Sequence, residues 1–153
     1  MTMPSASATV QINATPEEVY GLITDLPTLA SVAEEAVSMD LRKGSAIAKG
    51  AVFVGHNENR GKRWSTRCTV TDAEPGRTFA FDVRAIAIPV ARWQYDIVPD
   101  GEGCLVTEST WDLRPGWFRQ IAGMATGVSD RAAHNAKNIE LTLKHLKQWA
   151  EKR

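Results

Sequence analysis

The chain has 153 residues, of which 43% are hydrophobic and 24% are charged, the balance of an ordinary globular protein. This length predicts a single domain over residues 1–153, in which we expect residues 1–6 to be flexible. Eighteen Lys and Arg residues balance 18 Asp and Glu residues, so no net charge would attract nucleic acid, and we expect no nucleic-acid partner.

The first ten residues, MTMPSASATV, contain neither a basic region nor an apolar stretch of the kind that directs secretion. The sequence also contains no apolar run of about 20 residues, the length that a membrane-spanning helix needs. Cys68 and Cys104 lie far apart and outside metal-type spacing, which is typical of reduced thiols. These features predict a cytoplasmic protein.

The amino-terminal part predicts one strand followed by two short helices. Residues 7–13 (SATVQIN) have the character of a strand. Residues 15–18 (TPEE) then form a capping pattern that begins a helix, with Pro at its first position. Residues 25–27 (DLP) end this helix, and we expect a second short helix that ends near Glu35.

From residue 36 the hydrophobic pattern has a period of two, which predicts six further strands. Turn residues separate these strands by short links, and consecutive strands with short links form an antiparallel meander. One of the expected turns is at Ile88-Pro89. The expected strands are 36–42, 51–59, 63–73, 77–87, 90–98 and 103–113.

The chain after residue 116 is helical, but one helix from 116 to 152 would be roughly 55 Å long, against a domain diameter of roughly 35–40 Å. Gly123 and Gly127 are therefore expected to mark a bend or break, with Ser129 capping a main helix over 129–152. An apolar stripe on this helix must pack on the sheet. The stripe is Ala132, Asn135, Ile139, Leu143 and Leu146, whereas Arg131, His134, Lys137 and Lys144 lie mostly on the other face.

Three strands alternate apolar or aromatic residues with charged ones, which identifies their inward faces. These inward sets are Trp64, Thr66, Cys68 and Val70; Phe79, Phe81, Val83 and Ala85; and Ala91, Trp93, Tyr95 and Ile97. Strand 103–113 leaves two choices open, Val106, Glu108 and Thr110 or Leu105, Thr107, Ser109 and Trp111.

Polar residues recur on the inward faces, and a solid core rarely holds so many, because each unpaired buried polar group costs about 1–3 kcal/mol. We therefore predict a cavity with aromatic walls, the usual composition of a small-molecule site. Asn57 and Asn59 are expected to face it, the alternative being a frayed strand end that points to solvent. The predicted lining is Phe53, Gly55, Asn57, Trp64, Thr66, Cys68, Phe79, Phe81, Trp93, Tyr95, Val106, Glu108, Thr110, Met124, Val128 and Asn135.

Five segments resemble the SRPBCC superfamily of START and birch-pollen-allergen-like proteins, and most closely its bacterial polyketide cyclase/dehydrase-like group. They are residues 50–57 (GAVFVGHN), 63–70 (RWSTRCTV), 93–95 (WQY), 106–110 (VTEST) and 141–146 (LTLKHL). The resemblance implies an α+β helix-grip fold, in which a seven-stranded curved antiparallel sheet wraps around a long C-terminal helix, with two short helices after strand 1. It also implies a hydrophobic cavity that takes lipids, quinones or polyketides, and cyclisation activity in some members.

Alternate turns of a meander lie at the same end of the sheet, so residues 59–62, 86–90 and 114–118 are expected to cluster. The 86–90 tip (IAIPV) is apolar, although hairpin tips are usually polar, and basic residues surround it. This predicts a portal for an amphipathic or anionic apolar ligand, and a transient contact with a membrane interface. The alternatives are a tip that plugs its own core and a dimer contact, so a monomer and a homodimer both stay open. The predicted portal is Arg60, Ile86, Ile88, Pro89, Trp117 and Phe118.

Common catalytic and cofactor motifs are absent from the sequence, so we expect neither a metal nor a cofactor. Glu108 is the candidate catalytic residue, because a carboxyl group among the aromatic side chains would be desolvated and protonated. In the alternatives, Glu108 pairs with Arg131 or faces solvent. The sequence therefore predicts a carrier or sensor for a hydrophobic small molecule, or else a polyketide cyclase or dehydratase that uses Glu108 as acid or base.

Overall fold

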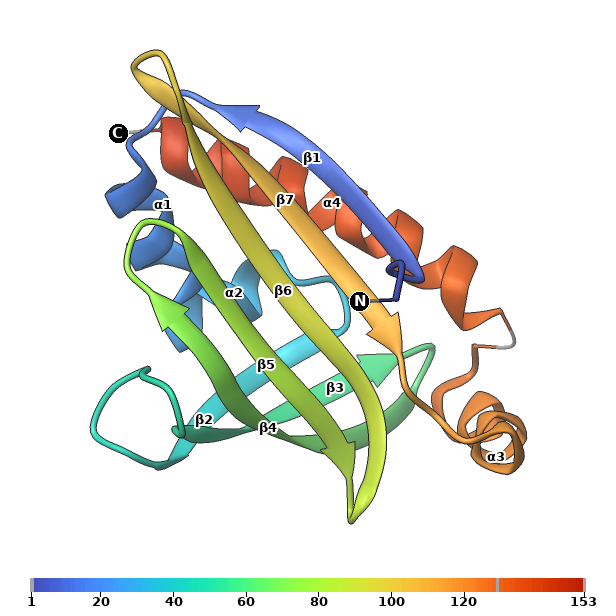
Figure 1. Ribbon diagram of the computed structural model, residues 1–153. Helices are drawn as coiled ribbons and strands as arrows, with labels where there is room; N and C mark the ends of the chain where they lie inside the picture. The colour runs from blue at the N-terminus through green and yellow to red at the C-terminus, as the bar shows by residue number, and fades with distance from the viewer. Residues whose placement is uncertain (1, 129, 153) are drawn as a thin grey trace.

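The computed structural model describes residues 2–128 and 130–152. Its strands form one antiparallel sheet in the order β1-β7-β6-β5-β4-β3-β2 (Figure 1). The strands are β1 (Ala6–Ile12), β2 (Ala36–Lys43), β3 (Val52–Asn59), β4 (Lys62–Glu74), β5 (Thr78–Ala85), β6 (Ile88–Asp100) and β7 (Gly103–Asp112). From β2 to β7 each strand pairs with the next one in the chain, which makes an antiparallel meander. β1 pairs with β7 and forms the edge of the sheet opposite β2.

Two short helices, α1 (Pro16–Ile23) and α2 (Leu26–Val32), connect β1 to β2. The Thr15 side chain accepts a hydrogen bond from the backbone N–H of Glu18, and the Asp25 side chain accepts one from that of Thr28. Each bond satisfies a backbone donor that the first turn of a helix leaves free. The chain therefore begins a new helix at residue 26 instead of continuing α1.

The last part of the chain forms α3 (Gly116–Thr126) and α4 (Arg131–Glu151). Gly127 ends α3 in the left-handed conformation with φ 73°, whereas Gly123 lies inside the helix. The Asp130 side chain caps α4 by accepting a hydrogen bond from the N–H of Ala133. The expected cap, Ser129, lies outside the described residues.

Irregular pairing bends the sheet around α4. Register shifts interrupt the pairings β2–β3, β4–β5 and β5–β6, and an extra residue in one strand bends that strand. α4 lies against one face of the sheet, along β1 and β7 (Figure 1). This arrangement confirms the predicted helix-grip fold, with two short helices after the first strand.

The structure differs from the prediction at several places. α2 ends at Val32 and not near Glu35, which lies in the link before β2. Ile88 and Pro89 begin β6, and the β5–β6 turn lies at residues 86–87. On α4, Ala132 is exposed and Arg131 is largely buried, the reverse of the predicted faces. The first turn of α4 therefore presents a charged side chain to the interior.

The packed part of the core lies where α1 and the second half of α4 cover the sheet. Ile12, Val19, Ile23, Phe79 and Leu146 are all completely buried there. At about 25 cal/mol per Å² of apolar surface, each such side chain stabilises the fold by roughly 1.5–3 kcal/mol. This end anchors the helix on the sheet, so the other end of the interior does not have to be filled by side chains.

Ile86, at the tip of the β5–β6 turn, has an unusual backbone. Its φ is 60°, and its side chain is 96% exposed. The left-handed conformation costs an L-residue about 1–2 kcal/mol, and it is especially rare for a β-branched residue. The exposed side chain gains no packing that offsets this strain.

We expect Ile86→Gly to raise the free energy of unfolding by about 1 kcal/mol, because relief of strain exceeds the added entropy of glycine in the unfolded chain. Urea denaturation measures the change, and the melting temperature should rise by about 2–4 °C. Ala87→Gly, at a neighbouring residue without a positive φ, is the control and should lower stability. Equal losses in both variants would show that Ile86 is not strained.

Candidate functional site

A cavity of about 270 Å³ lies between the sheet, α3 and the first half of α4. A single buried water occupies only about 10–15 Å³ on a comparable measure, so this space has room for much more than one water. Strands β3 to β7 supply most of the lining, which is mainly apolar and aromatic. The interior is therefore hollow at the end opposite α1, as the polar inward residues indicated.

Aromatic rings stiffen the sheet side of the cavity. The ring of Phe81 meets that of Phe53 edge-on at 5.2 Å and that of Phe79 at 5.3 Å. Phe79 in turn stacks on Tyr95 at 6.4 Å. Such ring pairs contribute about 0.5–1.5 kcal/mol beyond their buried area, so this row from β3 to β6 is a preformed wall.

The structure brings most of the predicted lining residues together. Asn57 lies on the wall with its Nδ2 atom 3.5 Å from the Gly55 carbonyl oxygen and from Thr66 Oγ1, both long contacts. A polar ligand atom could replace such contacts at little cost. The predicted residues that line the cavity are Phe53, Gly55, Asn57, Trp64, Thr66, Cys68, Phe81, Trp93, Tyr95, Glu108 and Asn135.

The other predicted lining residues lie elsewhere. Phe79 and Val106 are completely buried in the packed core, behind the wall. Thr110 is also buried, and its hydroxyl donates to the Arg92 carbonyl oxygen instead of facing the cavity. Val128 is buried in the link between α3 and α4, and Met124 is 78% exposed on the outer side of α3. Inward parity alone does not distinguish a packed position from a cavity position.

Asn59 faces neither the cavity nor bulk solvent. Its Nδ2 atom donates a hydrogen bond of 3.0 Å to the carbonyl oxygen of Thr126, the last residue of α3. The bond satisfies one of the free carbonyl groups at a helix C-terminus. Asn59 therefore holds the β3–β4 turn against α3, which closes one side of the cavity.

Two parts of the lining were not predicted. The first is the link between α2 and β2, which contributes Glu34, Glu35 and neighbouring residues; its sequence contains no motif that marks it. The second is a polar stripe on α4, which the spacing of polar residues in the sequence does indicate. Its spacings of four, three and four residues place one side chain per turn on one helix face. The stripe is Arg131, Asn135, Asn138 and Thr142, of which Asn135 is among the predicted lining residues and the other three are not.

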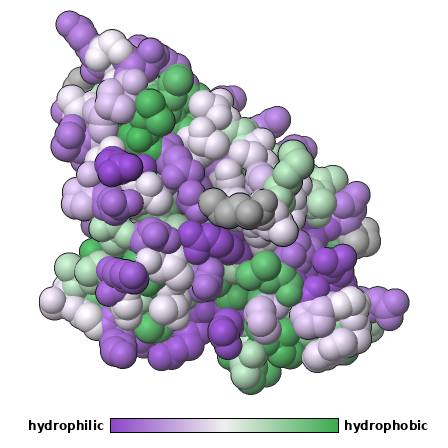
Figure 2. Space-filling view, viewed as in Figure 1, coloured by the Kyte–Doolittle hydropathy of each residue, from purple (hydrophilic) through white to green (hydrophobic). Residues whose placement is uncertain are grey.

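Of the six predicted portal residues, Phe118 borders the cavity. Ala85 and Val90, which flank the β5–β6 turn, line it as well. Figure 2 shows hydrophobic surface in the lower part of the view, near this turn and α3. Of the other portal residues, Trp117 is 61% exposed, Arg60, Ile86 and Pro89 are exposed, and Ile88 is half-buried.

Glu108 is the buried carboxyl group of the cavity. It is 3% exposed and lies directly across from Tyr95 in the β6–β7 pair, which decides the parity left open for β7. Burial raises the pKa of Glu108 to about 8, although a hydrogen bond from Tyr95 opposes the shift. Its Oε1 atom has no hydrogen-bond partner among the described residues. Glu108 therefore holds a proton at neutral pH, and it neither pairs with Arg131 nor faces solvent.

Two further titratable groups of the cavity wall, Tyr95 and Cys68, are unreactive. Burial, followed by the nearby Glu108 carboxyl, raises the pKa of Tyr95 well above its usual value. Burial likewise raises the pKa of Cys68 to about 12. A thiol with such a pKa is almost wholly protonated at neutral pH, so Cys68 is a wall residue and not a nucleophile.

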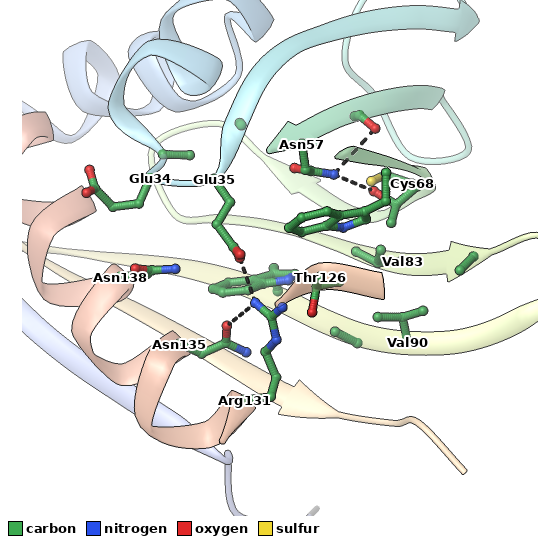
Figure 3. A pocket seen from close by; sticks show the side chains of 18 of the residues that line it. Glu34, Glu35, Asn57, Cys68, Val83, Val90, Thr126, Arg131, Asn135 and Asn138 are labelled. Carbon is green, nitrogen blue, oxygen red and sulfur yellow. Dashed lines mark hydrogen bonds and ion pairs between the residues drawn. The ribbon is translucent and has the colours of Figure 1, made fainter. Parts of the chain in front are cut away.

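Three further carboxylates line the cavity, and each has a basic partner. Glu34 lies 3.2 Å from His145, and Asp112 pairs with Arg114 at 2.8 Å. Glu35 Oε1 accepts a hydrogen bond of 2.7 Å from Arg131 Nη1 (Figure 3). The guanidinium of Arg131 also lies over the Trp64 ring, 6.0 Å from its centre. We call Glu35, Trp64, Arg131 and Asn135 the Arg131 cluster.

Comparison with known protein families gives a match over residues 3–147. The matching family is described as polyketide cyclase / dehydrase and lipid transport. The chain belongs to this family. The match and the fold together confirm the predicted place in the SRPBCC polyketide cyclase/dehydrase-like group, and they support a fold that binds hydrophobic ligands. A comparison with curated proteins finds no match.

Solved structures with the same fold differ widely in sequence. The di-domain ARO/CYC StfQ from the steffimycin biosynthetic pathway superposes with a TM-score of 0.74 at 14% identity. The comparison covers 96% of this chain but only 50% of StfQ, so this family member spans half the length of that protein. The Polyketide_cyc-like protein Cgl2372 from Corynebacterium glutamicum gives 0.64 at 23% identity and covers 99% and 94% of the two chains. The Aha1 dimer from Colwellia psychrerythraea gives 0.63 at 16% identity, with 96% coverage of both chains.

Neither a metal-binding cluster nor a membrane-spanning helix is found in the described part of the chain. Among residues 2–128 and 130–152, no three or more His, Cys, Asp or Glu side chains are grouped to hold a metal ion. Within the same ranges, no helix combines the length and the hydrophobicity that crossing a membrane requires.

The pKa of Glu108 predicts how stability depends on pH. Because this pKa is about 8 in the folded protein and 4.5 ordinarily, the folded state holds one more proton than the unfolded state between these values. The contribution of Glu108 to the free energy of unfolding should therefore be greatest below pH 4.5. Between pH 4.5 and pH 8 it should fall by up to about 1.4 kcal/mol per pH unit.

Glu108→Gln removes this proton, so its stability relative to wild type should rise from pH 5 to pH 8 and then level off. Urea denaturation of both proteins at a series of pH values measures the difference. A difference that stays constant with pH would show that Glu108 is not protonated in the folded protein.

Proposed function

We propose that this protein binds a hydrophobic small molecule in the cavity, as a carrier or sensor, and that Glu108 holds an oxygen atom of that molecule by a hydrogen bond. The observation that carries the proposal is a buried carboxyl oxygen, Glu108 Oε1, which has no hydrogen-bond partner in residues 2–128 and 130–152 and lies in a space lined by aromatic rings. A buried polar atom left unpaired costs about 1–3 kcal/mol, and a ligand oxygen would recover that cost.

The ligand that fits best is largely apolar and carries a carbonyl or hydroxyl oxygen. A protonated carboxyl group can donate one hydrogen bond and accept another, so it suits either group. Trp93 and Phe81 offer flat apolar surfaces near it, which suit a ring system or an acyl chain. A lipid, a quinone and a polyketide-like metabolite all combine these features.

Access to the cavity is proposed to lie between the β5–β6 turn and α3. Both elements border the cavity, and both expose apolar side chains, Ile86 on the turn and Trp117 on the helix. Isolated apolar residues are common on protein surfaces, but Ile86 also occupies a strained backbone conformation. Strain without a packing gain supports a role in ligand uptake.

The alternative function is cyclisation or dehydration of a polyketide-like substrate with Glu108 as general acid. Protonation of a substrate carbonyl by Glu108 must be matched by a base that removes a proton from carbon. Of the other cavity carboxylates, Glu35 and Asp112 pair with Arg131 and Arg114, and Glu34 lies against the imidazole of His145. A base for such a step is therefore less well provided than the acid, which favours binding without turnover.

Native mass spectrometry of protein purified from its own host separates the two functions. Release of an intact apolar metabolite supports the carrier or sensor. Release of a converted product, together with loss of conversion but not of affinity in Glu108→Gln, supports the enzyme.

Filling the cavity should abolish binding without unfolding the protein. Gly55 lines the cavity with an ordinary backbone, and the atom nearest to an added Cβ is Thr66 Oγ1 at 3.4 Å, so a side chain can project inward. We expect Gly55→Leu to weaken binding of the neutral dye Nile red at least tenfold, as measured by fluorescence titration.

Gly21→Leu is the matched control, because Gly21 lies on the exposed side of α1 with no atom within 4 Å of an added Cβ. It should bind the dye as wild type does. If wild type fails to bind Nile red, or if folded Gly55→Leu binds it unchanged, the cavity is not the binding site.

The proposed access route predicts an effect on rates. Ile86→Asp places a charge in the apolar path while leaving the cavity wall intact, so we expect association and dissociation of Nile red both to slow several-fold with little change in the dissociation constant. Stopped-flow fluorescence measures both rates. Val98→Asp, on an exposed residue of β6 away from the cavity, should leave them unchanged. Unchanged rates in Ile86→Asp would place the route elsewhere.

A further inference from the structure

The Arg131 cluster contains a guanidinium group whose bonding capacity is only partly used. Both hydrogen bonds of the Arg131 side chain within the described part of the chain come from Nη1, to Glu35 Oε1 at 2.7 Å and to Asn135 Oδ1 at 3.4 Å. An arginine side chain has five N–H donors on three nitrogen atoms. The side chain is 13% exposed, so bulk water reaches little of it.

A second arginine on the same wall shows what a complete pair looks like. Arg114 donates from Nε to Asp112 Oδ1 at 2.9 Å and from Nη2 to Asp112 Oδ2 at 2.8 Å. This is the two-bond arrangement in which a guanidinium and a carboxylate match best. Arg131 and Glu35 share one bond only, although they too are largely buried. The Arg131 pair is therefore the weaker and the more easily exchanged of the two.

Glu35 is held loosely on its other side as well. Its Oε2 atom is buried and has no hydrogen-bond partner among the described residues, and His134 Nε2 lies 3.5 Å away. A buried carboxylate oxygen without a hydrogen bond is costly, so Glu35 gains from any movement that lets this oxygen bond to His134 or to water. Its present position leaves both charged groups incompletely satisfied.

The surroundings fix Arg131 in the orientation that a ligand would need. The Trp64 ring lies on one side of the guanidinium, with its centre 6.0 Å from the central carbon. Figure 3 shows the Glu35 side chain reaching Arg131 from the α2–β2 link and the Asn135 side chain reaching it from α4. An arginine already oriented loses little freedom when it binds a planar anion.

We propose that Arg131 binds the anionic head group of an amphipathic ligand, a carboxylate or a group of similar shape, and that Glu35 occupies this position until the ligand displaces it. The proposal rests on the function proposed above and narrows the ligand class. The apolar part of the molecule fills the cavity, an uncharged oxygen bonds to Glu108, and a terminal anion takes two bonds from Arg131. Displaced Glu35 then turns its carboxylate toward His134.

The experiment compares decanoate with its methyl ester, which has the same chain without the charge, as competitors of Nile red. Wild type should prefer decanoate. Arg131→Gln should weaken decanoate at least about tenfold, since a two-bond ionic contact is lost, and change the ester less than twofold. Glu35→Gln should strengthen decanoate several-fold, because the internal competitor is gone, and leave the ester unchanged.

Two further variants make the result specific. Arg67→Gln removes a positive charge from an exposed position of β4 that does not line the cavity, and should leave both affinities within twofold. The double variant Glu35→Gln with Arg131→Gln removes the whole ion pair and leaves no single charge buried alone. It therefore tests the head-group preference if Arg131→Gln does not fold. Folding of each variant is checked by urea denaturation.

The outcomes separate this inference from the proposed function. If wild type binds neither Nile red nor the ester, the proposed function fails. If both bind but the preference for decanoate survives in folded Arg131→Gln or in the double variant, only the head-group site is wrong. Weaker binding of decanoate to Glu35→Gln would also overturn it, because Glu35 would then assist the anion.

Discussion

α4 must satisfy two different environments along one face, and this constraint shapes the whole interior. In its second half, Leu143, Leu146 and Ala150 are buried against β1 and the packed core. In its first half the same side of the helix carries Arg131 and Asn135, which cannot enter a dry core without partners. The helix can therefore be anchored at one end only, and the sheet curves past its other end and leaves a space.

The charges around this space are arranged so that its two ends differ in polarity. The link between α2 and β2 carries Glu34 and Glu35, and both reach across to α4, to His145 and to Arg131. These contacts pin the link over the cavity, which a short connection without secondary structure would not do alone. Glu108, by contrast, lies between the uncharged residues Ala8 and Tyr95 of the neighbouring strands. A ligand thus meets a neutral hydrogen-bonding group on the sheet and a charged one at the helix.

Much of the fold follows from the sequence because strands and helices leave clear periodic signals. The alternation in β4, β5 and β6 fixes which residues point inward, and the capping residues Thr15 and Asp25 mark both short helices. The site is harder to predict, because parity shows which residues point inward but not whether α4 packs against them. That depends on their position along the helix axis. Phe79 and Phe81 have the same parity, yet only Phe81 lines the space. A charged side chain usually indicates an exposed position, so the sequence places Arg131 on the wrong face of α4.

The side chains, and not the fold, decide what such a protein does. StfQ and Cgl2372 share the sheet and helix with this chain at identities of only 14% and 23%, so the common fold does not imply a common activity. A preformed aromatic wall gives affinity to almost any apolar molecule of suitable size, and selection must then come from polar groups that are poorly satisfied when the cavity has no ligand. Glu108 Oε1 and Glu35 Oε2 are the buried side-chain oxygens without hydrogen bonds among the described residues, and they belong to the neutral and the charged end of the same cavity. Leaving each oxygen unpaired costs stability that a smaller apolar residue would not. The proposed ligand would relieve both costs, because it bonds to Glu108 and, by taking Arg131, releases Glu35 toward His134.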